Sequence, residues 1–558
     1  MPAIKPTRTK AATNTSAKNG PNQGPKPAAS KSAASRSTAS KPKAPKSTSK
    51  MKRQFPDDSL PRPAKRLKPI SPTAPPLNTP PSTKLRIYVV GDGESGELGL
   101  GPHPIAGKKP TSVKRPRLNP LLPAATVGVV QIAAGGMHCV ALTDDQQILT
   151  WGVNDDGALG RDTTWQAPVR DVDGGADEGD SEDEGDLSPK ESTPIAIPRE
   201  SFGALSGLFV QVVAADSASF ALTSDGLVYG WGTFRSSDGI LGFTTANALE
   251  ANKTNNLKKR FQRTPTQIPF LTNIVSLAAG NNHVLALDTR GSVFAWGIAE
   301  QHQLARHVVA RHRTAALTPS RVANLPPAKL IAAGAYHSFA VAEDGAVYAW
   351  GANGFGQTGV PSGAGESDAI IPTPTIVEAL RGHTIRSIAG GEHHSLAATQ
   401  GQVLIWGRCD DNQAGLDLSA LPPSSLIFDS RSRPRILAPT IIPDLSFIYK
   451  VSAGIDNSFA ITSHGTAYAW GFGANYRHAL GTEENVAVPT LVRGEAKPRG
   501  ERDIFTVAEC GGQFSVLAGP GGVAGERPIM SYDGKVLAGP AGMEKYKLLL
   551  ASRQELGQ

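Results

Sequence analysis

The chain has 558 residues, a formal net charge of +8 and 39% hydrophobic residues. Its three cysteines, Cys139, Cys409 and Cys510, lie far apart without Cys-x-x-Cys spacing, which disfavours a disulfide framework and a zinc finger. No apolar run approaches the roughly 18 residues of a membrane-spanning helix and no hydrophobic signal core is present, so we expect an intracellular protein outside membranes.

The first segment, residues 1–84, carries 18 Lys and Arg against two Asp and almost no apolar side chains. Such a composition cannot form a core, so we expect a disordered basic tail. Eleven residues separate two basic clusters, Lys52-Arg53 and the KRLK stretch that contains Lys65, Arg66 and Lys68. This spacing predicts a bipartite nuclear-import signal for an importin, and the charge predicts salt-dependent binding to DNA phosphates. The alternative is a tail that only aids solubility.

The next segment contains Gly91, Gly93 and Gly96 in a G-x-G-x-x-G pattern directly after an apolar strand. A dinucleotide-binding loop would require a helix at the third glycine and an acidic residue about 20 positions later. The stretch ELGLGPHP disfavours a helix, and no Asp or Glu occurs between Glu97 and Asp144. These glycines are therefore predicted to be tight-turn residues.

The same glycine recurs seven times along the chain, usually after a Trp and a short apolar strand. The seven positions are Gly91, Gly152, Gly232, Gly297, Gly351, Gly407 and Gly471. A second element, typified by IAAGGMHCVALT from Ile132, also occurs seven times and precedes all but the first of these glycines. Short strands in a long repeat predict an all-β fold, a seven-bladed β-propeller.

The order of these elements predicts how the ring closes. The first element is a late strand of a blade, Ile87–Val90, and the last is an early pair in ECGGQFSVLAG. Pairing them would complete the seventh blade from both ends of the chain and remove two open sheet edges. We therefore expect residues 85–518 to form the propeller and residues 519–558 a C-terminal extension. An acidic run predicts a disordered insert at 171–190, and a long polar insert occupies 244–267.

The segments GDGESGELGLG, AAGGMH, NDDGALGRDT, GTFRSSDGILG and GGEHHS resemble the regulator of chromosome condensation family over about residues 85–518. The resemblance implies a nuclear, chromatin-bound guanine nucleotide exchange factor for the small GTPase Ran. Such a protein acts in nucleocytoplasmic transport and in spindle and nuclear envelope assembly. It performs no covalent chemistry, so we expect no cofactor and no metal, and we expect a monomer. The alternative is a non-catalytic chromatin scaffold with the same propeller.

The resemblance also implies which loop residues promote exchange. These are Asp216, Asn282, His393 and Arg235, with Glu94 at a comparable loop end. Asn282 replaces an Asp of the family pattern, while Ala218 and Phe514 replace histidines, and Asn282 and Phe514 favour the scaffold alternative. One repeat position holds His138, His283, His337 and His394, which we interpret as structural residues bonded to backbone between blades.

Two inserts are implied to contact partners. The segment 244–267, which begins with Thr244, Thr245 and Ala246, is expected to form a β-hairpin that wedges against the GTPase. The segment Arg306–Arg321 is expected to reach the acidic patch of the nucleosome through Arg306, Arg311 and Arg313, because guanidinium groups bind carboxylates in bidentate pairs. The alternative for both segments is a solvated surface loop.

Overall fold

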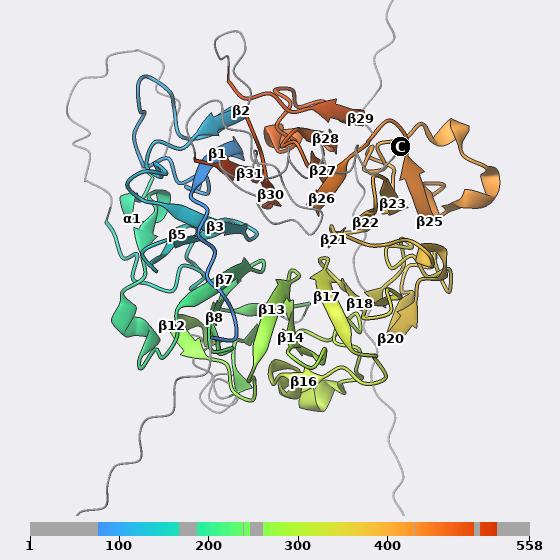
Figure 1. Cartoon of the computed structure of the whole chain (residues 1–558), viewed down its shortest axis with the longest axis horizontal. Coiled ribbons are helices and arrows are strands. Elements are labelled where there is room, and N and C mark those ends of the chain that lie inside the picture. The colour runs from blue at the N-terminus through green and yellow to red at the C-terminus, as the bar shows by residue number, and fades with distance from the viewer. Residues whose placement is uncertain are drawn as a thin grey trace, which may run out of the picture. The chain divides into compact units, whose positions relative to one another are not determined.

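Seven antiparallel sheets surround a central opening in the computed structural model of the chain (Figure 1). The structure describes residues 76–166, 187–237, 239–245, 260–429, 431–495 and 503–521. The predictions for the import clusters and most of the basic tail, the acidic run 171–186, Ala246 and the C-terminal extension from 522 onward lie outside these residues. All seven sheets belong to one compact unit.

Each sheet is a blade whose first strand faces the centre of the ring. We number the blades 1 to 7 in the chain order of these first strands. They are β3 (Val129–Ala134), β7 (Phe209–Ala214), β13 (Ile274–Ala279), β17 (Ala328–Ala333), β21 (Ser387–Gly390), β26 (Ile448–Ala453) and β30 (Val507–Cys510). The second strands are β4 (His138–Thr143), β8 (Ala218–Thr223), β14 (His283–Asp288), β18 (His337–Ala342), β22 (His394–Ala398), β27 (Asn457–Thr462) and β31 (Phe514–Pro520).

The third strands carry the recurring Trp-Gly pair or its equivalent. They are β5 (Ile148–Gly152), β9 (Val228–Gly232), β15 (Val293–Gly297), β19 (Val347–Ala352), β23 (Val403–Arg408), β28 (Ala467–Gly471) and β1 (Leu85–Asp92). The fourth, outer strands are β6 (Ile195–Ala196), β12 (Gln262–Gln267), β16 (Ser320–Arg321), β20 (Ile370–Ile376), β25 (Pro434–Ile442), β29 (Val486–Leu491) and β2 (Ser112–Leu118).

A few elements lie outside this four-strand plan. Blade 5 has a fifth strand, β24 (Leu426–Phe428), and β10 (Phe234–Ser236) with β11 (Gly239–Gly242) forms a separate hairpin. The structure describes one short α-helix in full, α1 (Pro189–Ser192). The 3-10 helices are Arg199–Phe202, Ala310–Leu317, Glu378–Leu380, Leu418–Ala420, Pro423–Ser425 and Ala474–Tyr476.

The predicted closure of the ring is confirmed. Strand β1 pairs with β31 over a register that runs from Leu85 opposite Pro520 to Gly91 opposite Phe514. Gly91 has a φ of 115°, and a Cβ atom there would lie 2.5 Å from the Cα of Phe514. The glycine that begins the G-x-G-x-x-G pattern is therefore required by strand geometry, which supports the turn interpretation.

The predicted boundaries need four corrections. Residues 76–84 were assigned to the disordered tail, but Asn78 donates to the backbone carbonyls of Thr223 and Ile274, at 3.3 and 2.8 Å. Strand β31 continues two residues past 518. Helix α1 occupies the end of the predicted acidic insert 171–190. The last residues of the predicted wedge 244–267 are the outer strand β12, which pairs with β9.

A repeated contact joins neighbouring blades. The Nε2 atoms of His138, His283, His337 and His394 lie 2.8 to 3.0 Å from the hydroxyl oxygens of Ser219, Ser338, Ser395 and Ser458. Ser338 Oγ also donates to the carbonyl of Gln303 at 3.1 Å, so its other bond is accepted from a protonated Nε2 of His283. The structural interpretation of these histidines is supported, but the partner of each Nε2 is a serine hydroxyl instead of a backbone group.

Six tryptophans fill the spaces between blades. Trp151, Trp231, Trp296, Trp350, Trp406 and Trp470 are all fully buried. Trp350 Nε1 donates to the carbonyl of Gln303, the same oxygen that accepts from Ser338. One loop carbonyl thus holds two side chains of the next blade, and the indole N–H groups of Trp151, Trp231, Trp406 and Trp470 donate to loop carbonyls in the same way.

Candidate functional site

The loops between first and second strands meet around one mouth of the central channel. Backbone N–H groups link successive loops: Asp216 donates to the carbonyl of Asn281 at 2.9 Å and Gly136 donates to that of Asp216 at 3.1 Å. The link across the closing blade runs from the N–H of Gly512 to the carbonyl of Gly136, at 2.7 Å. We call this ring of loops the loop belt. It fixes the backbone from which Asp216, Asn282 and His393 extend.

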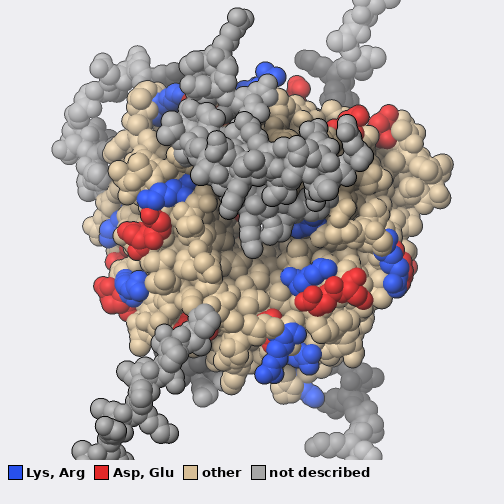
Figure 2. All heavy atoms as spheres, in the orientation of Figure 1, with Lys and Arg blue, Asp and Glu red and all other residues tan. Residues whose placement is uncertain are grey.

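The channel behind the loop belt has a volume of about 430 Å³ and is lined mainly by Ala of the first strands and Gly of the loop belt. Small side chains are needed there because seven strands converge on one axis. In Figure 2 the centre of the ring is hollowed, and Lys and Arg side chains stand beside Asp and Glu side chains around it. The described part of the chain therefore shows mixed charge in this view, whereas the sequence places the excess of basic residues in the tail.

Asp216 is half-buried at the mouth of the channel. Its carboxylate accepts from Ser217 Oγ at 3.3 Å and lies over Gly136 of blade 1, where a Cβ atom would come within 2.3 Å of Asp216 Oδ1. Burial raises the pKa of Asp216, while Ser217 and the nearby Arg235 guanidinium partly oppose this rise. A carboxylate held in this way has lost part of its water shell and can bind a basic partner side chain at reduced desolvation cost.

The hairpin β10–β11 projects from blade 2 beside Asp216. Its base is packed, because the rings of Phe234 and Phe243 are stacked with centroids 5.6 Å apart and both residues are buried. Arg235 is at its exposed side and forms an ion pair with Asp156 of blade 1. This hairpin lies just before the segment 244–267, for which the predicted wedge hairpin stays a prediction because residues 246–259 lie outside the described ranges.

The described parts of the predicted wedge segment pack on the propeller instead. Thr245 Oγ1 lies 2.7 Å from Thr318 Oγ1 of blade 3, and Thr244 is also engaged in a polar contact. Neither threonine therefore extends freely toward a partner. Glu94 is exposed on the loop of blade 7, where its N–H donates to Asp92.

His393 lies within a stack of rings on the loop belt. The ring of Phe355 is parallel to it with centroids 4.1 Å apart, and Tyr336 stacks more loosely at 6.1 Å. Burial lowers the pKa of His393 to about 4, and the positive charges of Arg408 and Arg435 contribute to this decrease. The imidazole is therefore neutral at physiological pH, where it can both donate and accept a hydrogen bond.

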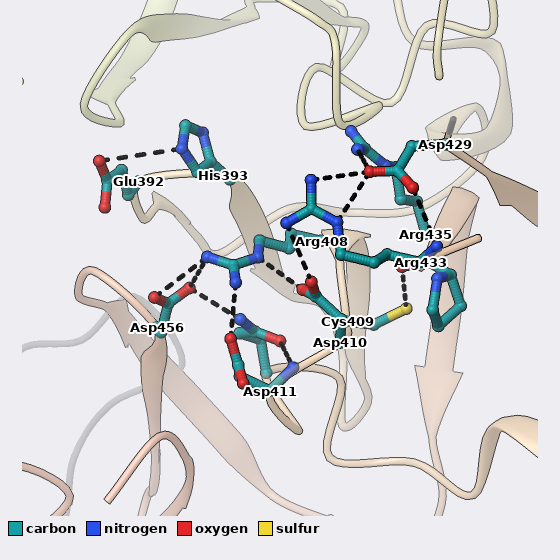
Figure 3. Close-up of polar contacts among 12 residues, drawn as sticks. Glu392, His393, Arg408, Cys409, Asp410, Asp411, Asp429, Arg433, Arg435 and Asp456 are labelled. Carbon is teal, nitrogen blue, oxygen red and sulfur yellow. Dashed lines mark hydrogen bonds and ion pairs between the residues drawn. The ribbon is translucent and has the colours of Figure 1, made fainter. Parts of the chain in front are cut away.

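An arginine-carboxylate network supports this stack (Figure 3). Arg408 contacts Asp410 at 2.5 Å, Asp411 at 2.6 Å and Asp456 of blade 6 at 3.1 Å. Figure 3 also shows two further arginines, Arg433 and Arg435, converging on the carboxylate of Asp429.

The network reaches His393 through an aromatic ring. The guanidinium of Arg435 lies 3.9 Å from the ring centroid of Phe355, which in turn stacks on His393. Our sequence analysis missed this network. The GRCDDNQ stretch of blade 5 held a signal, because an Arg at the end of the third strand is followed closely by two Asp residues.

Several predicted residues have other environments than expected. Arg306 turns inward, and its guanidinium donates to the carbonyls of Ala295, Ala316 and Thr318 at 3.0 to 3.1 Å. Its guanidinium is thus engaged by backbone carbonyls of its own blade, and its predicted nucleosome contact stays a prediction. Arg311 and Arg313 are exposed on the 3-10 helix Ala310–Leu317 and stay predictions.

Two apparent departures from the family pattern turn out to be structural. Ala218 and Phe514 begin the second strands of blades 2 and 7, the same position that His283 occupies in blade 3, and both are buried. They therefore belong to the contact between blades. They do not remove a polar group from the exposed loop belt.

Within the described ranges, no helix combines the length and apolarity needed to span a bilayer. The described residues also contain no group of three or more His, Cys, Asp or Glu side chains suited to hold a metal ion. What the loop belt offers is polar contact and shape, because an acid, a neutral imidazole and a projecting hairpin share one end of the ring.

Residues 86–517 match the family model described as RCC1-like domain. The guanine nucleotide exchange factor SRM1 of Saccharomyces cerevisiae is 41% identical over 442 residues, which cover 78% of this chain and 87% of SRM1.

The crystal structure of Prp20p from Saccharomyces cerevisiae has 36% identity and a TM-score of 0.68, with coverage of 84% of this chain and 95% of Prp20p. It was described together with its binding to Gsp1p and histones. A structure of Kap60 bound to yeast RCC1 (Prp20) is similar with 37% identity and a TM-score of 0.68, with coverage of 83% of this chain and 96% of that chain.

Proposed function

This chain belongs to the family of RCC1-like domains, the regulators of chromosome condensation, and from this premise we propose that it is a guanine nucleotide exchange factor for a Ran-type small GTPase. The observation that carries the proposal is the hairpin β10–β11 beside Asp216 on the loop belt. An exchange factor needs a rim that grips the GTPase and an element that displaces its nucleotide contacts. Both are combined at this end of the ring.

Exchange requires differential binding. The factor must bind the nucleotide-free GTPase more tightly than the loaded one, since only a difference in affinity can shift that equilibrium. In our proposal Asp216 pairs with a basic side chain of the GTPase, and the partly dry environment of its carboxylate strengthens this pair. The Nδ1 atom of neutral His393 is buried, so in our proposal its Nε2 is the atom that bonds to a polar group of the same surface.

The hairpin β10–β11 supplies the displacing element. It is narrow, its base is fixed by stacked phenylalanines, and its exposed end carries Arg235 and Ser237. A rigid projection that fits the empty GTPase but collides with the phosphate-binding region of the loaded one makes the two affinities differ. No covalent bond is made or broken in this cycle.

We also propose that the protein works in the nucleus on chromatin. Yeast Prp20p binds histones and yeast RCC1 binds Kap60, and the basic tail of this chain has the charge and cluster spacing for DNA phosphates and an importin. Exposed Arg311 and Arg313 are candidates for a nucleosome contact. Release of GDP near chromosomes would then give direction to nucleocytoplasmic transport and to spindle and envelope assembly.

The scaffold alternative loses the two observations that favoured it. Phe514 is buried between blades, and Asn282 retains a side-chain oxygen that is in use on the loop belt. Neither residue removes a feature that exchange needs.

The deciding measurement is the release rate of labelled GDP from a purified Ran-type GTPase, with and without the full-length protein. Asp216→Asn and Asp216→Arg should slow release progressively, with unfolding midpoints measured for both. Asp344→Arg, an exposed turn position at the opposite ends of the strands, is the matched charge control. A wild-type protein that leaves GDP release at its intrinsic rate would overturn the proposal.

A further inference from the structure

Hairpin β10–β11 is too short to hold its own orientation. Strand β10 has three residues and β11 has four, and an isolated two-stranded hairpin is only marginally stable in water. Its base is packed through Phe234 and Phe243, but Arg235, Ser237 and Gly239 nearer the tip are exposed. The direction of the tip must therefore be set by contacts with other blades.

Blade 3 supplies two such contacts. The side-chain oxygen of Asn282, on the loop belt, accepts the backbone N–H of Arg235 at 2.7 Å. The carboxylate of Glu300, in the loop after β15, accepts the backbone N–H of Ser237 at 3.2 Å and its hydroxyl at 3.0 Å. Both acceptors thus hold backbone N–H groups of the hairpin.

Blade 1 supplies a contact on the other flank, where Asp156 pairs with the Arg235 guanidinium. The hairpin is consequently held from both neighbouring blades although it grows out of blade 2. Glu300 lies 63 residues from Ser237 in sequence, so no local pattern reveals this bond.

We propose that Asn282 and Glu300 are positioning residues that preset the hairpin before the GTPase arrives. This inference rests on the proposed exchange function. A hairpin that is already oriented avoids the ordering cost that a mobile one would incur during binding, so more of the contact energy can go into displacing nucleotide.

The role of Asn282 depends on an acceptor and not on a negative charge. The donor is a backbone N–H, which fixes the amide oxygen as the atom that faces it. Aspartate would offer the same oxygen, so an Asn in place of the family's Asp preserves this contact. Removal of the acceptor should instead loosen the hairpin, with a loss on the order of threefold to tenfold in exchange rate per bond.

The test combines amide hydrogen exchange of the free full-length protein with GDP release. Asn282→Leu and Glu300→Ala should accelerate hydrogen exchange in residues 234–242 and slow GDP release at saturating GTPase, whereas Asn282→Asp, which keeps the acceptor, should retain the wild-type protection of the hairpin. Gln513→Leu removes the side-chain amide from the equivalent loop position of blade 7 and should leave hydrogen exchange of the hairpin unchanged.

The two hypotheses fail in different ways. If Asn282→Leu and Glu300→Ala leave hairpin protection at the wild-type level, or loosen the hairpin without slowing release, the positioning role is wrong. If the wild type itself does not release GDP, the exchange function is wrong, and hairpin protection still decides whether the anchors exist. Glu300 is exposed, so its substitution tests the hairpin even where Asn282→Leu proves unstable.

Discussion

His393 and Phe355 lie face to face at the mouth of the channel, with ring centroids 4.1 Å apart and planes inclined by only 15°. The pair comes from loops of adjacent blades, so the histidine is held by a residue that its own blade does not contain. Burial is the largest cause of the low pKa of His393, and the Phe355 ring covers one face of the imidazole.

Phe355→Ala should therefore raise the pKa of His393 from about 4 toward 6.5, because the imidazole becomes hydrated. Titration of the His393 resonance by NMR measures this directly. Phe355→Tyr, which keeps a stacked ring, is the control and should leave the pKa low. A pKa that stays near 4 in Phe355→Ala would show that Arg408 and Arg435 dominate instead.

The buried histidines between blades should make the propeller sensitive to acid. Burial lowers the pKa of His283 to about 3 and that of His138 to about 4. As the pH falls from 6.5 toward these pKa values, these histidines bind protons in the unfolded chain but not in the folded protein. Stability is full above pH 6.5 and falls with pH, by up to about 1.4 kcal/mol per pH unit for each such histidine.

Denaturant unfolding between pH 4.5 and 8 checks this dependence. His283→Asn, which copies Asn457 at the same position of blade 6, should show a shallower loss of stability with acid. His103→Asn, at an exposed position, should keep the wild-type slope. Equal slopes in all three proteins would contradict the assignment of neutral, buried imidazoles.

Glu97 should have the opposite pH dependence. Burial raises its pKa to about 7, so the cost of its ionised form is full above pH 7 and vanishes as the pH falls below 4.5. Gln occupies the matching position in three other blades, at Gln303, Gln357 and Gln413, and accepts a backbone N–H as Glu97 does.

Glu97→Gln should stabilise the protein by about 1–3 kcal/mol at pH 8 and by little at pH 5. Thermal unfolding at both pH values measures the difference. Glu343→Gln is an exposed control that should change neither value. A gain that is equal at both pH values would mean that packing, and not the buried charge, is responsible.

Ser338 should contribute more to the free energy of unfolding than expected for a small side chain. Its hydroxyl accepts from His283 and donates to Gln303, so Ser338→Ala leaves the buried Nε2 of His283 without a partner and leaves the Gln303 carbonyl with only its bond from Trp350. We expect a loss of about 1–3 kcal/mol in unfolding free energy. Ser446→Ala, at an exposed position, serves as the reference. A loss no larger than that of the reference would argue against a stabilising role for this contact.

The propeller could be predicted because its defining residues repeat. Each glycine after a third strand adopts a positive φ, from 96° at Gly407 to 120° at Gly297, and each carries the same local signature in sequence. The closing pair of strands followed from the order of two repeated elements. Because every blade repeats the same short motif, the number of blades could be counted from the local pattern of a single sequence.

The candidate site was predicted only in part. Asp216, Asn282 and His393 were placed correctly on one set of loops, but the bonds from Asn282 to Arg235 and from Arg408 to Asp456 join different blades and leave no local trace. Phe514 was misread because the buried first residue of a second strand directly follows the exposed end of the loop belt. At this place, two neighbouring positions in sequence differ in role: one is a buried structural residue and the other is exposed and available for contacts.

The strand that completes blade 7 is the first to leave the ribosome, and its partner β31 is the last. During translation the edge of β1 that will pair with β31 therefore stays unpaired until six blades have been synthesised. This edge can meanwhile pair with wrong strands or bind chaperones. A chain truncated before Phe514 lacks β31. Its ring cannot close, and its loop belt is therefore incomplete.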